Sequence, residues 1–516
     1  MSKVQNKYAL ISVSDKSNIE DIARSLVDLG YTILSTGGTA KYLTSMSIPN
    51  VSVSDFTEFE EILGGRVKTL HPKIHAGILA KSLRDLDDCS DVYDLIDIVI
   101  VNLYPFEKTI SKSSCTYEDA IENIDIGGPA MLRAAAKNHN RVTVITDPND
   151  YTKVIEEIRK NSKTTISLRR YLAHKVFKQT SVYDAAIRNY LYQKNEKTDM
   201  IDDFSLVFEK ESNLRYGENP HQKAALYEIK SPKFAGFDYI QVSGKELSYN
   251  NIVDSESALS CVKQFKKPAC VIVKHANPCG VAEGKDISDA YKSAYKTDPT
   301  SAFGGIIAFN KKLDDKLLSK ILSRQFVEVI IVPSYEKHCL TVLKSKPNVR
   351  LLSIKDFSKT PSRYEIKTLK NKLLIQETDD KELKKSDLNI VSKKQPTSLQ
   401  LEDLMFAFKV SRYVKSNSII FVKNKKTLAI GAGQMSRIDS TNIAKNKAKN
   451  QKINLKGSVM ASEAFFPFRD NVDLAKKIGV SSILQPGGSI KDQEIIDVAN
   501  SHGISMVFSG IRVFKH

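Results

Sequence analysis

A lysine and a histidine stand side by side at the end of an apolar run. The run VIVKHANPCGVA covers residues 271–282, and its β-branched start, 271–273, predicts a strand covered on both faces. An imidazole can move a proton and an ammonium can stabilise an oxyanion, so Lys274 and His275 could serve a transfer reaction. Adjacent residues on a regular strand point to opposite faces, so we expect the strand to end or bend here, with residues 277–280 supplying the turn. A solvated lysine beside a core histidine is the plainer interpretation.

A second group of candidates lies near the N-terminus, where hydroxyls, glycines and cations follow predicted strands. Backbone N–H groups, hydroxyls and a helix N-terminus at the carboxyl edge of a sheet form an anion site suited to phosphate. Ordinary turns with solvated cations are the alternative, but three such clusters within about 70 residues favour a phosphate site. These residues are Ser12, Ser14, Lys16, Ser35, Thr36, Gly37, Gly38, Arg66, Lys68 and Thr69.

Three further residues with acid, base or charge-stabilising chemistry follow the third strand. NLYPF contains Tyr104, and IDIGGPAMLRAAAKNH contains Asp125 and Lys137. A phenol, a carboxylate and an ammonium could divide proton transfer and charge stabilisation between them. Singly they fit a turn tyrosine, a helix cap and a solvated lysine, and only their clustering favours function.

The composition excludes several classes of protein. With 516 residues, 41% of them hydrophobic, the chain should form about two to four domains. No apolar run reaches the length of a membrane span, and the N-terminus has no signal-peptide core, so we expect a soluble cytoplasmic protein. Six cysteines make no CxxC pair, and His71 and His75 lack a third ligand, so no metal site is expected.

The net charge of +17 raises the question of nucleic-acid binding. However, the lysines are spread among acidic residues without interleaved aromatic residues, for example in DDKELKKSD. This distribution is typical of a solvated surface, and we expect no nucleic-acid partner.

The order of predicted elements indicates α/β structure throughout. Strands at 8–14, 31–36, 97–103 and 141–147 alternate with helices at 17–30 and 151–194, which is typical of a parallel sheet. Ser17 and Glu20 have capping-box spacing, and Gly30 stands where a left-handed cap residue belongs. A boundary is expected near residue 199, so the first domain is 1–199 and the rest is 200–516.

The second region repeats its own pattern. Strands at 269–275, 306–309 and 327–333 come first, followed by a lysine-rich stretch, 334–396, that predicts little. A helix at 402–416 and strands at 418–422, 428–433, 481–485 and 505–510 then repeat the alternation. We therefore expect two similar α/β units, about 200–370 and 371–516.

Long motifs carry a resemblance to one known family. They are SVSDKSNIEDIA, LSTGGTAKYL, GGRVKTLHPKIHAGIL, NLYPF, IDIGGPAMLRAAAKNH, LRYGENPHQ, VKHANPCG, DPTSAFGGIIAFN, GAGQMSRID and EAFFPFRDNVD. Together they resemble the bifunctional purine-biosynthesis family that joins AICAR formyltransferase to IMP cyclohydrolase. The resemblance runs from about residue 8 to the C-terminus, falters over 334–396, and is closer to the bacterial form because a long insertion is missing.

The resemblance implies two consecutive reactions. The C-terminal site passes a formyl group from the co-substrate 10-formyltetrahydrofolate to the 5-amino group of AICAR, and the N-terminal site closes the product to IMP without a metal. It implies a methylglyoxal-synthase-like first domain, and a transferase region of two cytidine-deaminase-like units without their zinc. It also implies a homodimer with transferase sites at the interface, small-molecule nucleotide and folate substrates, and no membrane partner.

The resemblance also assigns roles to residues. His275 would assist deprotonation of the amine while Lys274 stabilises the oxyanion, and Glu328 stands where animal members have aspartate. The remaining nucleotide contacts would be Arg215, Tyr216, His221, Gly304, Asn417, Arg437, Phe465 and Arg512. The folate side would be Gln434, Met435, Pro467, Phe468, Asp470, Asn471 and Ser489. In the first domain the phosphate-site residues would form the nucleotide cradle, with Lys137, Tyr104, Asp125 and Lys68 acting in ring closure.

Three other hypotheses compete with this one. A methylglyoxal-synthase-like lyase would explain the N-terminal cradle but not the remaining chain. A non-catalytic nucleotide-sensing or RNA-binding module would fit the charge but not Lys274 and His275. A degenerate member with only one activity would carry the same motifs, because a displacement of about 1 Å can silence a complete site.

Overall fold

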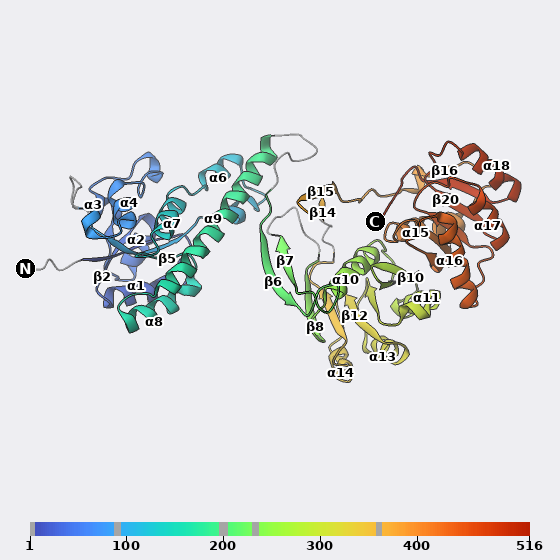
Figure 1. The fold of residues 1–516 in the computed structure, drawn as a ribbon, viewed down its shortest axis with the longest axis horizontal. Helices are drawn as coiled ribbons and strands as arrows, with labels where there is room; N and C mark the ends of the chain where they lie inside the picture. Colours follow the sequence, from blue (N-terminus) through green and yellow to red (C-terminus); the bar gives the residue numbers. More distant parts are fainter. Residues whose placement is uncertain (1–5, 87–93, 196–204, 230–236, 358–363) are drawn as a thin grey trace, which may run out of the picture. The chain divides into compact units, whose positions relative to one another are not determined.

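The computed structural model describes residues 6–86, 94–195, 205–229, 237–357 and 364–516. The chain divides into two compact units, Met1–Val207 and Phe208–His516 (Figure 1). The boundary expected near residue 199 lies outside the described residues. No helix in the described part is long and apolar enough to span a membrane.

The first unit is built on a parallel sheet of five strands in the order β3-β2-β1-β4-β5. The four strands predicted from the sequence are all present, and the short β3 is an addition. The chain moves outward in opposite directions from β1 and β4, so a crevice is expected where these two strands end. The strands are β1 (Lys7–Val13), β2 (Tyr31–Ser35), β3 (Val51–Ser52), β4 (Ile96–Asn102) and β5 (Thr143–Ile145).

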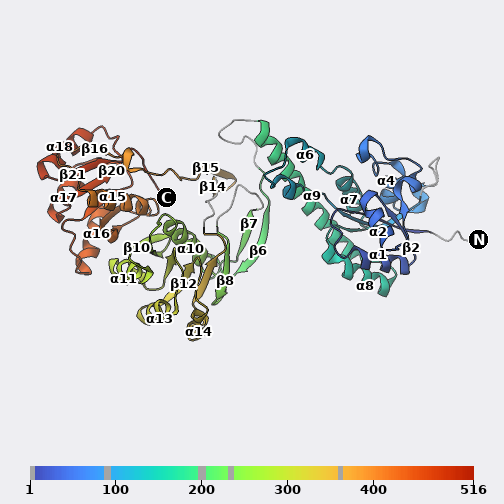
Figure 2. The same ribbon diagram turned by 180° about the vertical axis from the view of Figure 1, so that it is seen from behind.

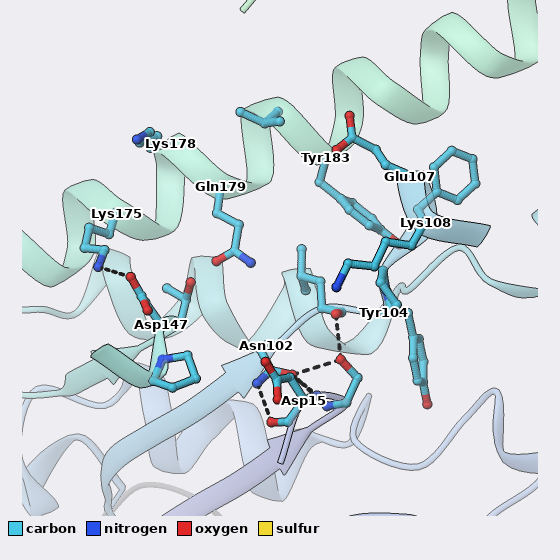
Figure 3. A pocket seen from close by; sticks show the side chains of 17 residues that line it. Asp15, Asn102, Tyr104, Glu107, Lys108, Asp147, Lys175, Lys178, Gln179 and Tyr183 are labelled. Atoms are coloured by element: carbon cyan, nitrogen blue, oxygen red, sulfur yellow. Dashed lines mark hydrogen bonds and ion pairs between the residues drawn. The ribbon is translucent and has the colours of Figure 1, made fainter. Parts of the chain in front are cut away.

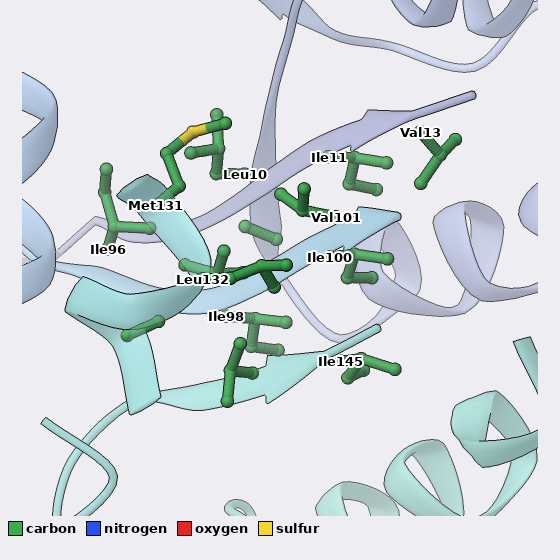
Figure 4. Packing of buried hydrophobic residues seen from close by; sticks show 14 of the residues in the cluster. Leu10, Ile11, Val13, Ile96, Ile98, Ile100, Val101, Met131, Leu132 and Ile145 are labelled. Atoms are coloured by element: carbon green, nitrogen blue, oxygen red, sulfur yellow. The ribbon is translucent and has the colours of Figure 1, made fainter. Parts of the chain in front are cut away.

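Helices pack against this sheet and bury its apolar side chains. Met131 and Leu132 of α7 lie against strand residues such as Leu10 and Ile98 (Figure 4). The helices are α1 (Ile19–Asp28), α2 (Gly37–Ser45), α3 (Val53–Thr57), α4 (Pro72–Leu79), α5 (Phe106–Ile110), α6 (Tyr117–Glu122), α7 (Gly127–Lys137), α8 (Tyr151–Asn161) and α9 (Ile166–Asn195).

The start of α1 differs from the prediction. Ser17 does not cap the helix, because its hydroxyl donates to Asp15 Oδ1 at 2.6 Å and Asn18 precedes the helix with φ of 57°. The predicted left-handed residue at the other end is confirmed, since Gly30 has φ of 80°. The helical stretch predicted at 151–194 is two helices, separated where Ser162 takes φ of 60°.

The second unit contains a mixed sheet of 12 strands with two hairpins outside it. The sheet order is β16-β21-β20-β19-β17-β18-β10-β9-β11-β12-β13-β8. Its strands are β8 (Tyr239–Ser243), β9 (Ala269–Lys274), β10 (Asn277–Glu283), β11 (Gly305–Phe309), β12 (Val327–Val332), β13 (Arg350–Ile354), β16 (Asn389–Ile390), β17 (Ile419–Lys423), β18 (Lys426–Gly431), β19 (Val459–Ser462), β20 (Ser482–Gln485) and β21 (Ser505–Phe508). The hairpins are β6 (Phe208–Leu214) with β7 (Ala224–Ile229), and β14 (Tyr364–Leu369) with β15 (Lys372–Glu377).

This large sheet consists of two halves with the same topology, as the sequence pattern indicated. From the centre outward the strands are β10, β9, β11, β12, β13 and β8 in one half, and β18, β17, β19, β20, β21 and β16 in the other. The antiparallel and parallel pairings match strand for strand. The halves meet where β10 pairs with β18. The expected division near residue 370 falls at the turn of the β14–β15 hairpin.

The helices repeat as well, and each half packs its own set around its strands (Figures 1 and 2). A helix before the central hairpin, α10 or α15, contacts the first hairpin strand, and a helix after it, α11 or α16, contacts the second. They are α10 (Tyr249–Val262), α11 (Ile287–Thr297), α12 (Pro299–Ala302), α13 (Asp315–Arg324), α14 (His338–Lys344), α15 (Ser398–Ser411), α16 (Arg437–Asn450), α17 (Asp470–Ile478) and α18 (Asp492–His502).

Each half has a glycine where its second hairpin strand approaches the following helix. Gly280 on β10 faces Ala294 of α11, and Gly431 on β18 faces Ser440 of α16. A Cβ atom at either glycine would collide with the carbonyl oxygen of the helix residue. In both halves, therefore, the second hairpin strand touches the following helix backbone to backbone.

Candidate functional site

The carboxyl ends of β1, β2 and β4 bring the hydroxyls of the N-terminal cluster together. The Ser12 and Thr36 hydroxyls are 2.9 Å apart, so the loops after β1 and β2 meet. The Ser14 hydroxyl donates to Asn102 Oδ1 at 2.9 Å and to the Leu103 carbonyl at 2.8 Å. Asn102, which sequence reasoning did not single out, also accepts the Ser14 and Asp15 N–H groups. It holds the β1 loop in place.

The N-terminus of α2 lies next to this cluster, because the helix begins directly after Thr36. Thr36 precedes the helix in extended conformation and makes no side-chain cap bond, which leaves the first turn to accept an anion. Lys68 reaches this turn, since its Nζ lies 3.6 Å from the Cβ position of Gly37. Ser35 differs, because its buried hydroxyl donates to the Ile11 carbonyl at 2.9 Å and so points into the core.

Asp125 stands at the start of α7, close to the same lysine. Its Oδ1 accepts the Gly128 N–H at 2.8 Å, and a Cβ on Gly128 would lie only 2.6 Å from Oδ2. The Cβ position of the neighbouring Gly127 is 2.6 Å from Thr69 Oγ1. Burial raises the pKa of the Asp125 carboxyl, although hydrogen bonds from backbone N–H groups and the charge of Lys68 act in the opposite direction. A carboxyl, an ammonium and a hydroxyl thus meet at the N-terminus of α7.

Two predicted residues lie apart from this group. Lys137 is the last residue of α7, and because the helix has 11 residues its ends are about 15 Å apart. The structure therefore does not bring exposed Lys137 to Asp125. Arg66 is ion-paired with Glu122 of α6, and both side chains are exposed. A third predicted residue, Lys16, lies in the loop after β1 and is half-buried.

A pocket of about 710 Å³ opens beside the cluster, under α9. It includes Ser14 and Tyr104, and it extends past them toward the end of β5. Figure 3 shows the Lys108 and Gln179 side chains facing this space, and the Lys175 ammonium bound to Asp147 at 2.6 Å. The Tyr104 side chain is 45% exposed, so its phenol is accessible to a small molecule.

In the second unit, Lys274 ends β9 and His275 begins a two-residue turn. His275 and Ala276 have φ of 53° and 57°, and β10 starts directly at Asn277. The expectation that the strand ends at this pair is confirmed, but the prediction that residues 277–280 form the turn is wrong, because they belong to β10. The Lys274 ammonium donates to the Phe303 and Gly304 carbonyls, both at 3.1 Å. The imidazole is exposed at the turn.

A group of charges lies along the neighbouring strands. Asn251 of α10 donates to Glu328 Oε2 at 2.8 Å, and the same oxygen is 3.8 Å from the buried Arg350 guanidinium. Arg215 donates to the Tyr216 hydroxyl at 2.9 Å, and its charge acts on Arg350. Three predicted residues thus come together. Asn251 and Arg350 were missed, since no local sequence signal marks a partner on another element.

The other half of the sheet reaches this turn through one hydrogen bond. The Lys415 N–H donates to Asn277 Oδ1 at 2.9 Å, which places the loop before β17 beside the β9–β10 turn. On this loop Asn417 is tied to Gln434, whose carbonyl accepts the Asn417 backbone and side-chain N–H groups at 3.0 and 2.9 Å. The catalytic candidates of one half therefore meet a polar loop of the other.

A buried ion pair follows this loop. Arg437 at the start of α16 contacts Glu463, which is fully buried, at 3.1 Å. Glu463 also accepts the Ser418 N–H at 3.0 Å. The aromatic ring of Phe514 lies 5.9 Å from Arg437 and 4.5 Å from Arg512. Both predicted arginines thus border one ring, whereas His221 lies on the exposed segment between β6 and β7.

The residues expected on the folate side differ in exposure. Met435 and Phe468 are 91% and 57% exposed, as a stacking surface requires. Asn471 is only 2% exposed and binds Thr441 Oγ1 and Asp470 Oδ1, so its amide supports Asp470 instead of facing solvent. Phe465 and Pro467 are half-buried in the loop before α17, Asp470 is half-buried at the start of that helix, and Ser489 follows β20.

Taken together, the fold and these clusters define an enzyme with a parallel-sheet unit that carries a polar cluster at its strand ends, and a duplicated α/β unit that carries a lysine–histidine pair. Family comparison agrees. Residues 135–447 match the family described as AICARFT/IMPCHase bienzyme, and residues 18–130 match the MGS-like domain. The first match covers more than half of the chain, so the chain belongs to the AICARFT/IMPCHase bienzyme family. Membership indicates formyltransferase and cyclohydrolase activities, the last two steps of IMP synthesis.

Comparison with solved structures adds little. One, described as the crystal structure of ForH, is 33% identical and covers 36% of this chain and all of that chain, with a TM-score of 0.33. That score is too low to support a statement about the fold. Within the described ranges, no group of three or more His, Cys, Asp or Glu side chains could hold a metal ion.

Proposed function

We propose that the chain carries out both reactions, and that two separate sets of residues perform them. Residues 1–199 would form the cyclohydrolase domain and 200–516 the transferase region, with subdomains at about 200–370 and 371–516. The observation that carries the proposal is the turn at Lys274 and His275, which presents an accessible imidazole beside an anchored ammonium. Cytoplasmic location is part of the same proposal.

Formyl transfer requires a base and a cation at one carbon. The AICAR amine is conjugated with its ring, so it is a poor nucleophile, and negative charge develops on the formyl oxygen. His275 takes the amine proton. An ammonium has three donors, and Lys274 uses two of them on the Phe303 and Gly304 carbonyls. The third is left to stabilise the oxyanion.

The nucleotide and the folate would approach this turn from different sides. Arg215, Tyr216 and Glu328 lie beside β12 and would bind the nucleotide, together with Arg437 and Arg512. Exposed Phe468 and Met435 would stack on the pterin of 10-formyltetrahydrofolate, with Asp470 bonding its edge. His221, Gly304, Asn417, Phe465, Gln434, Pro467, Asn471 and Ser489 complete the proposed set.

Ring closure needs orientation, an oxyanion partner and proton movement. Lys68 and the first turn of α2 would hold phosphate or developing negative charge, and Asp125 and Tyr104 would move protons. The family's role for Lys137 requires it to act from the far end of α7. We therefore assign the proton-transfer role first to Asp125 and Tyr104 and keep Lys137 as a proposal.

We also propose a homodimer, in which a second copy completes each transferase site. The exposure of Met435 and Phe468 supports this, because apolar side chains gain stability when they are covered. Sedimentation equilibrium of the full chain should give twice the monomer mass, and transferase activity per chain should fall on dilution below the dimer dissociation constant. A monomer with undiminished activity would contradict the dimer.

The activity itself is tested by supplying AICAR and 10-formyltetrahydrofolate to the full chain. Tetrahydrofolate formation is followed by absorbance and IMP by chromatography. We expect both products, and His275→Ala should lower transferase kcat by about 10²-fold or more, since it removes the acid–base group. His338→Ala, an exposed histidine of the same unit, is the control. Failure of the wild type to form tetrahydrofolate would contradict the transferase proposal.

A further inference from the structure

The turn that carries His275 adopts a backbone conformation that costs energy. His275 and Ala276 both have positive φ, 53° and 57°, as in the two-residue type I′ turns of hairpins. Residues with a Cβ meet a steric cost in the left-handed region, so glycine or asparagine is usual there. Other contacts must therefore hold this turn.

Helix α10 supplies these contacts from two positions on one face. The two oxygens of the Asp254 carboxylate each accept one turn N–H, from His275 at 3.2 Å and from Ala276 at 2.7 Å. Three residues further along the helix, Ser257 donates its hydroxyl to the Ala276 carbonyl at 3.1 Å. The turn is thus fixed by one helix on both its donor and its acceptor side.

The second half of the sheet repeats this arrangement, in which one helix aspartate accepts both N–H groups of the hairpin turn. We call the arrangement an aspartate clasp. Asp403 of α15 accepts the Asn424 N–H at 2.9 Å and the Lys425 N–H at 2.7 Å. These two residues form the β17–β18 turn, each with φ of 55°. The spacing is 21 residues in both halves, from Asp254 to His275 and from Asp403 to Asn424. Here, however, an asparagine takes the place of the histidine.

We propose that Asp254 is a positioning residue for formyl transfer. It fixes the backbone of the β9–β10 turn and thereby the direction in which the His275 imidazole leaves it. Asp403 has the same structural task in a turn without an acid–base group. The inference rests on the proposed role of His275, and it goes further by tracing the orientation of that imidazole to a carboxylate on another element.

The matched pair Asp254→Asn and Asp403→Asn tests this in the full-length protein. An amide has one acceptor oxygen and an NH₂ group that would face a second donor, so each variant loses one clasp bond. Both should lose similar thermal stability. Asp254→Asn should lower transferase kcat by about 10- to 100-fold with less than about a threefold change in the KM for AICAR, because a misplaced base slows chemistry more than binding. Asp403→Asn should keep kcat within about twofold.

Ser257→Ala provides a second, milder variant in case Asp254→Asn does not fold. It removes the bond to the Ala276 carbonyl and should lower kcat with KM unchanged. Cyclohydrolase activity, measured on formyl-AICAR in every variant, reports that the first unit is intact. Equal kcat losses in Asp254→Asn and Asp403→Asn, or an unchanged kcat in Asp254→Asn or Ser257→Ala, would overturn the proposal. An inactive wild type would instead contradict the proposed function.

Discussion

At the scale of single residues, the two sites use burial differently. His275 and Tyr104 are exposed and depend on neighbouring groups for position, whereas Asp125 is largely covered by α7 and the loops around it. A buried carboxylate is costly, and this cost gives Asp125 a raised pKa. A raised pKa brings the proton exchange of this carboxyl closer to neutral pH, as a group that moves protons in catalysis requires.

Asp125→Asn should therefore separate stability from activity. Between the ordinary pKa of 3.8 and the raised folded-state pKa, the folded chain binds more protons than the unfolded chain, so stability falls as pH rises through that window. At neutral pH the ionised carboxylate costs stability, and the amide removes that cost. We expect a higher melting temperature than wild type at neutral pH, and a smaller difference at about pH 4.5.

The same variant should lose cyclohydrolase kcat by about 10²-fold while transferase kcat is unchanged. Melting curves at the two pH values and separate assays of the half-reactions provide the check. A variant that is less stable than wild type at neutral pH would show that the charge of Lys68 outweighs burial.

Individual residues also show what sequence reasoning could reach. Types and order identified Lys274, His275, Lys68 and Asp125, because motifs are local. The partners Asn102, Asp254 and Arg350 were not identified, since their hydrogen bonds join segments brought together only by folding.

At the scale of elements, strand and helix order could be predicted well and turns less well. Runs of β-branched residues indicate buried strands, so the predicted bounds of β9 and β12 agree with the structure to within about one residue. The β9–β10 turn was misplaced because Asn-Pro is a common turn signal, whereas His-Ala is not. The clasp by Asp254 overrides that local preference.

A glycine pair offers a prediction at this scale. Gly304 and Gly457 occupy matching places, with φ of 68° and 73°, and their Cβ positions lie 3.0 Å from Lys274 Nζ and 3.2 Å from Lys423 Nζ. Replacing either by alanine should cost about 1–2 kcal/mol of unfolding free energy, because of the left-handed backbone. Only Gly304→Ala should also lower transferase kcat, since it displaces Lys274, which we propose stabilises the oxyanion.

Urea denaturation of both glycine variants measures the first effect, and tetrahydrofolate formation measures the second. If Gly457→Ala slowed formyl transfer as much as Gly304→Ala, the lysine displacement would not be the cause.

At the scale of the whole molecule, the two units have separate apolar cores. Among the described residues, two apolar clusters lie within residues 9–183 and three lie within 247–513. Independent cores permit independent unfolding, so calorimetry of the full chain should show two transitions. Gly457→Ala should lower one transition only. A single transition that shifts as a whole would contradict independent cores.

Duplication is the feature of the whole molecule that sequence reasoning only suggested. The two halves of the large sheet share strand order, helix placement and an aspartate clasp, yet their sequences differ at the turn that the clasp holds, with His275 in one and Asn424 in the other. Backbone topology is conserved between the halves by packing, while side-chain chemistry is free to differ.

The central claim, two separate sites in one chain, is tested most directly by supplying each substrate to one variant of each site. His275→Ala given formyl-AICAR should form IMP at the wild-type rate, but given AICAR and 10-formyltetrahydrofolate it should form almost no tetrahydrofolate. Lys68→Ala should form tetrahydrofolate normally and accumulate formyl-AICAR beyond its spontaneous closure. If either variant lost both activities while remaining folded, or kept both, the assignment of the two chemistries to two sites would be contradicted.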